Sequence, residues 1–293
     1  MAEGRIIKAI SGFYYVQSSG NVYQCRGRGI FRKQKITPFV GDFVEFEAPK
    51  PDEGYILAIN PRQNKLIRPP VANIDQVILV SSADMPEFKP LLLDRFLVSI
   101  EAKKMKPVIF LTKQDLIGEI AQRNLLDYQT VYEQIGYFVE LISGEEQEIS
   151  DRLRSYLTER VSVMAGQSGV GKSSLLNSLN PSLQLATGDI SMSLGRGKHI
   201  TRHVELVEAG GGLVADTPGF STLDFADIEA DELRDCFPEI RHRQGECKFR
   251  SCLHNHEPQC AVKKAVENGD IASSRYEHYL RFLEEIYSRK PRY

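Results

Sequence analysis

One segment, residues 166–173, constrains the fold of this chain more than any other feature. Its sequence, Gly-Gln-Ser-Gly-Val-Gly-Lys-Ser, matches G-x-x-x-x-G-K-[ST] at every defined position. An apolar run, Val161–Ala165, precedes it, and a helical pattern, Ser173–Asn180, follows it. Such glycines let backbone N–H groups surround a phosphate at the positive end of a helix. The segment predicts a phosphate-binding loop in an α/β sheet. The alternative is a glycine-rich turn that happens to hold a lysine.

The side chains of this loop have expected roles. Lys172 is expected to reach the β- and γ-phosphates of a nucleotide, and Ser173 to offer its hydroxyl to Mg²⁺. The residues expected to surround the phosphates are Gly166, Gln167, Ser168, Gly169, Val170, Gly171, Lys172, Ser173 and Ser174.

A second segment, Thr112-Lys113-Gln114-Asp115, predicts which base is bound. It resembles the N/T-K-x-D element of GTPases and follows the apolar run 107–111. The Asp115 carboxylate can accept two hydrogen bonds from guanine, whereas adenine would leave it unpaired at a cost of about 1–3 kcal/mol. Lys113 is expected to lie along the base and brace the loop. Alone, the four residues favour a solvated turn, but beside a complete phosphate loop they indicate guanine. Ser143, after the run 139–142, is expected to add a looser base contact.

A third segment, Asp216-Thr217-Pro218-Gly219, fits the D-x-x-G pattern of a γ-phosphate sensor. Asp216 suits Mg²⁺ binding through water, and the Gly219 N–H suits the γ-phosphate; a surface turn is the alternative. GTPases usually place the base motif after the phosphate loop, but here it comes first, so the order is circularly permuted. The sensor therefore continues directly into residues 224–293, which couples it to the C-terminal segment.

The sequence leaves the water-positioning residue open. Phe220 occupies the position after the D-x-x-G glycine, where Ras-like GTPases carry a glutamine. The segment 195–203 is rich in glycine and basic residues and suggests a loop that faces phosphate. Thr201 is a candidate Mg²⁺ ligand and His199 a candidate for positioning water; a basic surface loop without a catalytic role is the alternative.

Three regions differ in their hydrophobic pattern. Residues 1–68 show about five short alternating segments, which predict a small β-barrel of the OB or SH3-like type. Pro69-Pro70 is expected to be a linker. Residues 69–223 alternate apolar runs with helical patterns, which predicts a mainly parallel α/β sheet. Residues 224–293 lack strand patterns and end in a helix with Tyr276, Tyr279, Leu283 and Ile286 on one face.

Cysteine and histidine gather in residues 247–260 with the spacing C-x4-C-x-H-x5-C. Cys247, Cys252, His254 and Cys260 supply four ligands, which predicts a tetrahedral, structural zinc site with no position for a catalytic water. Free thiols and His256 in place of His254 are the alternatives. Cys25 and Cys236 stand apart and are expected to be core residues.

Charge is unevenly distributed along the chain. Residues 1–68 hold 11 Lys/Arg against 6 Asp/Glu, or +5, and residues 69–228 hold 14 against 21, or −7. The run that includes Arg26, Arg28, Arg32, Lys33 and Lys35 contains Phe31 but no acid. Basic residues also flank the cysteine segment: Arg241, Arg243, Lys248 and Arg250. These two patches favour RNA contact, with a solvated basic face as the alternative. No apolar run is long enough for a transmembrane helix, and a secretory signal is not expected.

These features together resemble the circularly permuted GTPases of the RsgA/YjeQ family over nearly the whole chain. The resemblance rests on the barrel, on G-Q-S-G-V-G-K-S and D-T-P-G in permuted order, and on C-x4-C-x-H-x5-C. It implies an OB-fold, GTP hydrolysis stimulated by the small (30S) ribosomal subunit, one zinc ion and a cytoplasmic role late in 30S maturation. It also implies that His199, in the G-K-H-T-T element, is catalytic. Ile200 replaces the first threonine of that element, and we expect Thr201 to contact Mg²⁺.

We therefore predict a GTP hydrolase with an OB-fold barrel at 1–68, a permuted α/β P-loop GTPase domain at 69–223 and a mostly helical zinc-binding domain at 224–293. Expected ligands are GTP or GDP, Mg²⁺ and one structural Zn²⁺. The expected partner is the 30S subunit with its 16S rRNA, for a monomer without membrane or DNA partners. Expected catalytic residues are Lys172, His199 and Thr201, and expected Mg²⁺ ligands are Ser173, Thr201 and Asp216.

Two other functions stay open. One is an ATP-dependent kinase or ATPase, against which Asp115 argues. The other is a non-enzymatic nucleic-acid-binding module that holds GTP as a structural ligand, which Phe220 leaves open.

Overall fold

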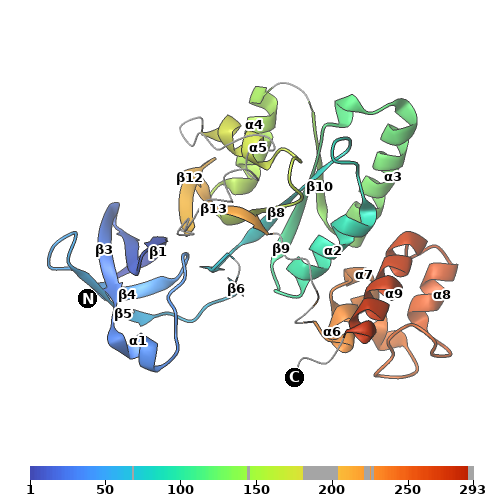
Figure 1. The fold of residues 1–293 in the computed structure, drawn as a ribbon. Coiled ribbons are helices and arrows are strands. Elements are labelled where there is room, and N and C mark those ends of the chain that lie inside the picture. Colours follow the sequence, from blue (N-terminus) through green and yellow to red (C-terminus); the bar gives the residue numbers. More distant parts are fainter. Residues whose placement is uncertain (68, 144–145, 181–203, 221–224, 226–227, 290–293) are drawn as a thin grey trace. The chain divides into compact units, whose positions relative to one another are not determined.

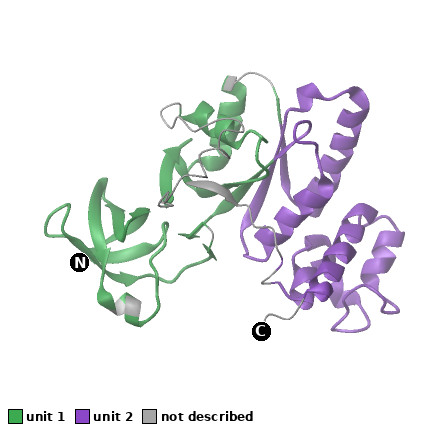
Figure 2. Ribbon diagram, viewed as in Figure 1, with its two compact units in different colours: residues 1–80, 142–221 green, residues 81–141, 222–293 purple. Residues whose placement is uncertain are grey.

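The computed structural model describes residues 1–67, 69–143, 146–180, 204–220, 225 and 228–289 (Figure 1). For residues 30, 32, 146 and 216–220 it describes the backbone alone. The chain forms two compact units, residues 1–80 with 142–221 and residues 81–141 with 222–293 (Figure 2). Each unit therefore combines stretches that are distant in sequence.

The first unit begins with a closed five-stranded barrel. Its strands alternate in burial, as in β4, where Val44 and Phe46 are buried and their neighbours are not. Strand β1 pairs with β2 and β4, β2 pairs with β3, and β5 pairs with both β3 and β4, so the ring closes. The strands are β1 (Ala2–Ile10), β2 (Phe13–Ser18), β3 (Asn21–Gly27), β4 (Phe43–Glu47) and β5 (Gly54–Ile59). The predicted N-terminal β-barrel is confirmed.

The basic run of the barrel differs from its prediction. Part of it forms a short helix, α1 (Gly29–Lys33), although only short strands were predicted for residues 1–68. Phe31 is only 7% exposed, so its ring belongs to the core and is not available to stack on a base. The aromatic partner of this run is Phe13 instead, whose ring centroid lies 4.7 Å from the Arg26 guanidinium.

Pro69-Pro70 lies in a hairpin rather than in an open linker. Strand β6 (Lys65–Leu66) pairs antiparallel with β7 (Val71–Ala72) on either side of the two prolines. An isolated bridge between Val40 and Val71 connects β7 to the barrel loop at 37–42. The connection is therefore part of the folded structure, because backbone pairing engages both of its strands.

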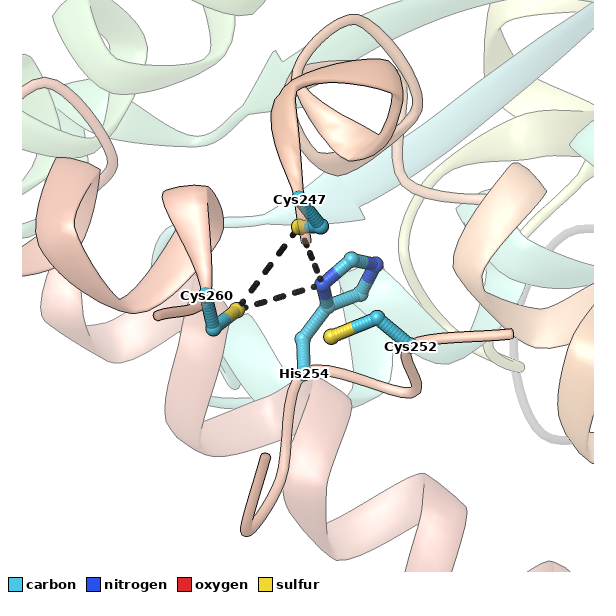
Figure 3. Close-up of side chains that lie close together, drawn as sticks. All are labelled: Cys247, Cys252, His254 and Cys260. Atoms are coloured by element: carbon cyan, nitrogen blue, oxygen red, sulfur yellow. Dashed lines mark hydrogen bonds between the residues drawn. The ribbon is translucent and has the colours of Figure 1, made fainter. Parts of the chain in front are cut away.

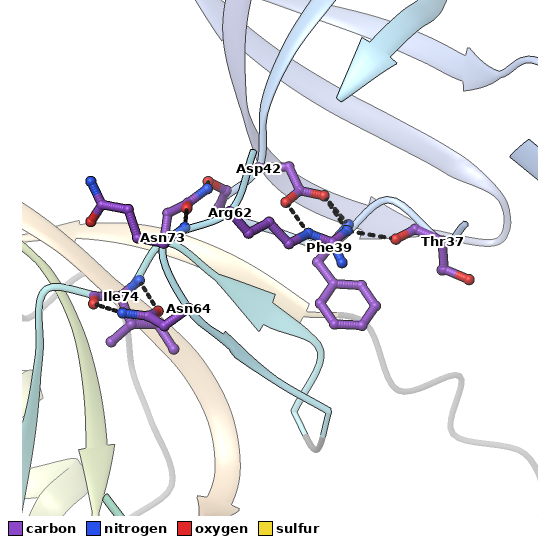
Figure 4. Close-up of polar contacts among 9 residues, drawn as sticks. Thr37, Phe39, Asp42, Arg62, Asn64, Asn73 and Ile74 are labelled. Carbon is purple, nitrogen blue, oxygen red and sulfur yellow. Dashed lines mark hydrogen bonds and ion pairs between the residues drawn. The ribbon is translucent and has the colours of Figure 1, made fainter. Parts of the chain in front are cut away.

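A group of four polar side chains, which we call the linker clamp, fastens this connection to the barrel (Figure 4). The Asp42 carboxylate is fully buried and accepts hydrogen bonds from Arg62 Nε and Nη2, both at 2.7 Å, and from the Phe39 N–H at 2.7 Å. Asn73 donates to the Gly41 carbonyl at 3.0 Å. The members of the clamp are Asp42, Arg62, Asn64 and Asn73, of which Asn64 exchanges two hydrogen bonds with the Ile74 backbone at 2.8 and 2.9 Å.

The α/β part of the first unit centres on three parallel strands in the order β8-β11-β13. All five residues of β11 are buried, as expected for a strand inside a sheet. Strand β12 is antiparallel to β13 and also to β1, which connects the sheet to the barrel, and Lys8 pairs with Glu205 at 2.8 Å there. The elements are β8 (Gln76–Ser82), α4 (Glu146–Leu157), β11 (Val161–Ala165), α5 (Lys172–Leu179), β12 (Val204–Ala209) and β13 (Gly212–Phe220).

The second unit contains the paired strands β9 and β10, with helices from both of its sequence stretches. Its α/β elements are α2 (Pro90–Glu101), β9 (Lys106–Thr112), η1 (Gln114–Leu116), α3 (Glu119–Ile135) and β10 (Phe138–Ile142). Helix α2 begins with Pro90 at its first turn and buries Leu93, Phe96, Leu97 and Ile100.

The described residues after Phe225 form helices and no strands. They are α6 (Ala230–Asp235), α7 (Pro238–Arg241), η5 (Gln244–Glu246), α8 (Ala261–Glu267) and α9 (Ser273–Ser288). Helix α9 buries Tyr279, Phe282, Leu283 and Ile286, largely as predicted. Cys236 lies in the same core, and Cys25 is fully buried in the barrel, so both are core residues as expected.

A buried ion network joins α2 to the C-terminal helices. Arg275 on α9 is 2% exposed, and it donates to Asp94 at 2.5 Å and to Glu239 at 2.7 Å. Asp94 also accepts from the Tyr132 hydroxyl on α3 at 2.7 Å. Because a buried charge is costly unless it is paired, this network strongly favours one arrangement of the helices that share it.

The observed architecture confirms the predicted class, with a barrel, an α/β sheet in permuted order and a helical C-terminal part. The borders at 68/69 and 223/224 stay a prediction, because the two compact units divide the chain differently. In the part of the chain that the structure describes, no helix has the length and apolarity needed to cross a bilayer.

Candidate nucleotide and metal sites

The phosphate loop lies in the first unit, between β11 and α5. Gly166 has a φ of +129°, and a Cβ there would lie 2.1 Å from the Val80 carbonyl oxygen, so only glycine fits. Gly169 and Gly171 also have positive φ values, +82° and +101°. This backbone leads into the N-terminus of α5, where the helix dipole favours an anion. The loop therefore has the local geometry of a phosphate cradle.

Lys172 begins α5, and its side chain turns back over the loop. Its Nζ donates to the carbonyl oxygens of Gly166 at 2.9 Å and Gln167 at 2.7 Å. Burial lowers the pKa of Lys172 from its usual value, because removal from water disfavours the charged form. A phosphate beside this ammonium would restore the favourable charge interaction, so the lysine suits an anionic ligand.

Strand β13 carries the D-T-P-G segment alongside the phosphate loop. It runs parallel to β11 and pairs Ala215 with Val163 and Phe220 with Ala165, with a register shift between these pairs. Gly166 directly follows Ala165, so the loop and the D-T-P-G segment lie at the same carboxyl edge of the parallel strands. Ligands of α/β sheets bind at such edges.

The predicted base motif lies in the second unit, where β9 ends. Thr112 is 6% exposed, and its hydroxyl donates to the Ser81 carbonyl at 3.3 Å. Lys113 then adopts a left-handed conformation with φ +61°, and its Nζ donates to the Met85 carbonyl. The chain continues into η1 with Asp115 exposed. The Asp115 carboxylate is therefore exposed just after the carboxyl end of β9, where it can accept hydrogen bonds from a base.

Four side chains of the C-terminal segment converge in a group that we call the Cys₃His cluster: Cys247, Cys252, His254 and Cys260 (Figure 3). Their ligand atoms all lie within 4.8 Å of one another. His254 Nδ1 is 3.6 Å from Cys247 Sγ and 3.4 Å from Cys260 Sγ, and these two sulfurs are 4.0 Å apart. Such distances separate the corners of a tetrahedron whose centre lies about 2.3 Å from each sulfur, which is the geometry of zinc.

The loop that carries the cluster is held by side chains outside the ligand set. The Tyr276 hydroxyl donates to the His254 carbonyl and the Tyr279 hydroxyl to the Leu253 carbonyl, both at 2.6 Å. The Glu257 carboxylate accepts from two backbone amides of the loop, at 2.7 and 2.9 Å. These contacts support the left-handed conformation of His254, with φ +59°, and they orient the ligands.

The chemistry of the donor set also fits zinc. Burial lowers the pKa of His254 to about 4 and raises the pKa of Cys252 to about 12. A bound Zn²⁺ requires neutral imidazole and thiolate, and its positive charge offsets the burial of the thiolates. His254 Nδ1 faces the sulfurs, whereas its Nε2 is buried without a hydrogen-bond partner. Nδ1 is therefore the ligand atom, and among the described residues His254 rather than His256 completes the cluster.

Comparison with known proteins identifies the family. The sequence model of the RsgA GTPase matches residues 59–226, and that of the RsgA N-terminal domain matches residues 3–56. The small ribosomal subunit biogenesis GTPase RsgA 2 of Oceanobacillus iheyensis is 62% identical over 293 residues and 100% of both chains. The small ribosomal subunit biogenesis GTPase RsgA of Geobacillus sp. strain WCH70 is 60% identical with the same coverage. The chain belongs to the RsgA GTPase family. It is therefore a GTP hydrolase.

Two solved structures resemble this RsgA GTPase along its length. The crystal structure of YloQ, a circularly permuted GTPase, has a TM-score of 0.86 at 50% identity and covers 100% of this chain and 97% of its own. The structure of YjeQ from Thermotoga maritima has a TM-score of 0.87 at 37% identity and covers 99% of both chains. The similarity to YloQ confirms the permuted fold that the motif order predicted.

For this RsgA GTPase, the individual site assignments remain predictions. His199 and Thr201 lie outside the described residues, and the side chains of Asp216 and its neighbours are not described. The phosphate loop, the D-T-P-G backbone and the half-buried Ser143 belong to the first unit, whereas Thr112–Asp115 belong to the second. The structure therefore gives the local geometry of the phosphate loop, of the D-T-P-G backbone and of the base motif separately. That the three segments form one nucleotide site is part of the proposed function.

The residues that support the Cys₃His cluster were not predicted from the sequence. Tyr276 and Tyr279 were expected only to pack on an apolar helix face, whereas their hydroxyls also hold the cluster loop. The sequence did contain a sign of this role, because tyrosine occupies positions where phenylalanine or leucine would pack equally well. A buried tyrosine hydroxyl usually finds a hydrogen-bond partner.

Proposed function

We propose that this RsgA GTPase binds GTP and Mg²⁺ at one site formed by the phosphate loop, the D-T-P-G segment and the base motif. It hydrolyses GTP while docked on the small ribosomal subunit and assists late maturation of that subunit in the cytoplasm. The observation that carries the nucleotide part is the pairing of Phe220 with Ala165, directly beside the phosphate loop. Full-length relatives at 62% and 60% identity, which are named small ribosomal subunit biogenesis GTPases, support the ribosomal part.

The loop residues bind and orient the nucleotide. Lys172 exchanges its contacts with the Gly166 and Gln167 carbonyls for oxygens of the β- and γ-phosphates. Ser173, Thr201 and Asp216 hold Mg²⁺, which when bound neutralises charge between the phosphates. The Gly219 N–H contacts the γ-phosphate, so the D-T-P-G segment senses whether the nucleotide is GTP or GDP.

The base motif selects guanine and has no catalytic role. Asp115 accepts hydrogen bonds from guanine, Lys113 lies along the base and Ser143 adds a further contact. Phe220 has no group that can orient water, so His199 takes that role. Turnover by the free protein is slow, and the small subunit accelerates it by completing the catalytic site at His199.

The barrel supplies a surface for 16S rRNA. Phe13 pairs with Arg26 across β2 and β3, and Arg26 pairs with Tyr55 across β3 and β5, so the three side chains form one row. The Arg26 guanidinium lies 4.7 Å from the Phe13 centroid, and Tyr55 is 48% exposed. Aromatic side chains stack on bases with about 1–3 kcal/mol per base, and arginine attracts the RNA backbone. This row fits single-stranded RNA.

The Cys₃His cluster binds one structural zinc ion. Four protein ligands fill a tetrahedral site and leave no position for a reactive water. Zinc thereby holds the loop between η5 and α8, next to Lys248, Phe249 and Arg250. Phe249 is 42% exposed, so this loop gives rRNA a second contact.

Hydrolysis assays with and without purified 30S subunits test the proposal. We expect the subunit to stimulate GTP hydrolysis strongly in the unmodified protein. Lys172→Ala should reduce the rate about 100-fold or more, because it removes the charge that stabilises the transferred phosphoryl group. His199→Ala should reduce mainly the stimulated rate. Lys104→Ala, at an exposed lysine outside the proposed site, is the control and should behave like the unmodified protein.

The outcomes separate the two halves of the proposal. Hydrolysis without stimulation by the subunit would contradict the ribosomal assignment and leave the nucleotide site in place. A Lys172→Ala variant with full activity would contradict the nucleotide site itself.

A further inference from the structure

Arg234, on helix α6, holds the loop that carries the Cys₃His cluster. Its Nη1 donates to the carbonyl oxygens of Arg250 and Cys252, both at 3.1 Å, and Cys252 is one of the four predicted ligands. Helix α6 and the cluster lie in the same core, because Leu233 and Cys252 are both buried in it. The guanidinium is therefore fixed against the backbone of a ligand residue.

The positive charge of Arg234 has no carboxylate partner in the part of the chain that the structure describes. Its Nε is also buried there without a hydrogen-bond acceptor. Two other arginines of the C-terminal helices have acidic partners, since Arg241 pairs with Glu101 at 3.3 Å and Arg243 with Asp270 at 3.2 Å. A buried donor without an acceptor costs free energy. A negative charge beside Arg234 would offset this cost.

The zinc-loaded cluster has such a charge. Zinc binds cysteine as thiolate and histidine as neutral imidazole, so three thiolates (−3) and one Zn²⁺ (+2) leave a net charge of −1 on the four ligands. Cys252, His254 and Cys260 are buried, so salt screens this charge poorly. The Glu257 carboxylate, which accepts from two loop amides, adds a second negative charge. The loaded loop therefore needs a cation.

The charge of Arg234 also reaches the ligand side chains. After burial, it is the second cause that lowers the pKa of His254. Charges interact more strongly at such a partly buried site than they do in water. The same guanidinium therefore attracts the thiolates that stand beside this imidazole.

We propose that Arg234 is the counter-charge of the zinc site, a positioning residue that stabilises the loaded cluster without ligating the metal. The inference rests on the zinc site of the proposed function. Without the guanidinium, the buried thiolates have a weaker positive environment, so zinc binds less tightly. Partners outside the ligand set typically change metal affinity about 10–100-fold when they are replaced.

A double-mutant cycle separates this charge effect from the hydrogen bonds that hold the loop. Arg234→Met removes the guanidinium and keeps most of the side-chain length. Cys247→His replaces one thiolate with an imidazole, so two thiolates (−2) and Zn²⁺ (+2) leave no net charge on a tetrahedral Cys₂His₂ site. Cys247 is the half-buried member of the cluster and accommodates a larger side chain best. The fourth protein carries both substitutions.

Zinc affinity of the full-length proteins is measured by competition with a chromogenic zinc chelator at fixed pH and salt. We expect Arg234→Met to weaken zinc binding about tenfold or more when the site has three thiolates. In the Cys247→His protein the same substitution should cost less than about threefold. Arg234→Lys keeps the charge and should stay within about threefold of the unmodified protein. Arg243→Met removes an arginine that already pairs with Asp270, and it should leave the affinity unchanged.

Each outcome decides the matter. An equal loss with three and with two thiolates would show that Arg234 acts only through its bonds to the loop backbone, and it would overturn the counter-charge. Unchanged affinity in Arg234→Met would overturn it as well and leave the zinc site standing. If the Cys247→His protein binds zinc too weakly to measure, Arg234→Lys decides, because a loss as large as in Arg234→Met excludes a role for the charge. An unmodified protein that binds no zinc would overturn the zinc site, and the inference with it.

Discussion

Asp115 is the residue on which guanine specificity depends under the proposed function. It is exposed in the turn after β9, and its carboxylate offers only acceptors. Asp115→Asn replaces one acceptor with a donor, which matches xanthine, where a carbonyl replaces the exocyclic amine of guanine. We expect GTP affinity to fall about 100-fold and XTP affinity to rise, because hydrogen bonds to a charged group contribute about 1.5–3 kcal/mol each. Competition titration with GTP and XTP measures both changes.

Asp127→Asn is the matched control, since Asp127 is an exposed aspartate on the nearby helix α3. Its GTP affinity should not change. If Asp115→Asn kept full GTP affinity, another residue would have to recognise the base.

His254 and His256 allow a residue-scale test of the metal site. His254 stands in the Cys₃His cluster, and His256 does not. We expect His254→Ala to lose the zinc and His256→Ala to keep one zinc per chain, measured by elemental analysis of the purified proteins. Loss of zinc should lower the thermal midpoint by about 10 °C, because metal-binding free energy is folding free energy. Zinc retained in His254→Ala and lost in His256→Ala would reverse the ligand assignment.

At the scale of elements, the linker clamp determines how the barrel joins the α/β part of the first unit. The Arg62 and Asp42 side chains are 19% and 0% exposed, so loss of the arginine leaves a buried carboxylate without its counter-charge and with only the Phe39 N–H as a donor. We expect Arg62→Ala to lower the free energy of unfolding by about 3 kcal/mol. The chain has no tryptophan, so circular dichroism during urea denaturation is the suitable measurement.

Arg28→Ala is the control for the clamp. Arg28 pairs with Glu47 at 3.1 Å, but their side chains are 50% and 51% exposed. An exposed pair contributes only about 0–1 kcal/mol. Equal effects of the two variants would mean that the clamp contributes no more to stability than a surface ion pair.

At the scale of the whole molecule, the charge distribution predicts how binding to the small subunit depends on salt. Residues 1–68 carry a net +5, from 11 Lys/Arg and 6 Asp/Glu. We expect 30S affinity to fall with rising KCl, and Arg26→Gln to reduce the slope of log K against log[salt] by about 0.7–0.9 if Arg26 neutralises one phosphate. Filter binding over a series of salt concentrations measures this slope.

Tyr55 provides the contrast to Arg26, because stacking involves no counterion release. Tyr55→Ala should lower the affinity and leave the slope unchanged. Arg123→Gln, at an exposed arginine of α3, should change neither quantity. If Arg26→Gln kept the full slope, the RNA surface would have to be assigned elsewhere.

Much of the architecture follows from local sequence patterns. The alternation of apolar residues predicted about five short barrel strands in residues 1–68, and the apolar runs at 107–111, 139–142 and 161–165 predicted β9, β10 and β11. Helix α1 and the β6–β7 hairpin were missed, because both are short and depend on contacts with the barrel. Phe31 has the same local sequence whether its ring faces the core or the solvent, and only the surrounding strands decide that it is buried.

Local sequence was enough to predict the features whose chemistry lies within a few consecutive residues: the phosphate loop, the D-T-P-G segment, the cysteine and histidine spacing and the permuted order. Each works through backbone conformation or ligand spacing within a few residues. Which distant side chains share a buried site depends on the three-dimensional fold. Arg275 meets Asp94 across 181 positions, and Arg289 holds Phe225 across 64. Such contacts form because a buried charge or carbonyl must find its partners inside the protein, and only the fold brings residues that are distant in sequence within reach of one another.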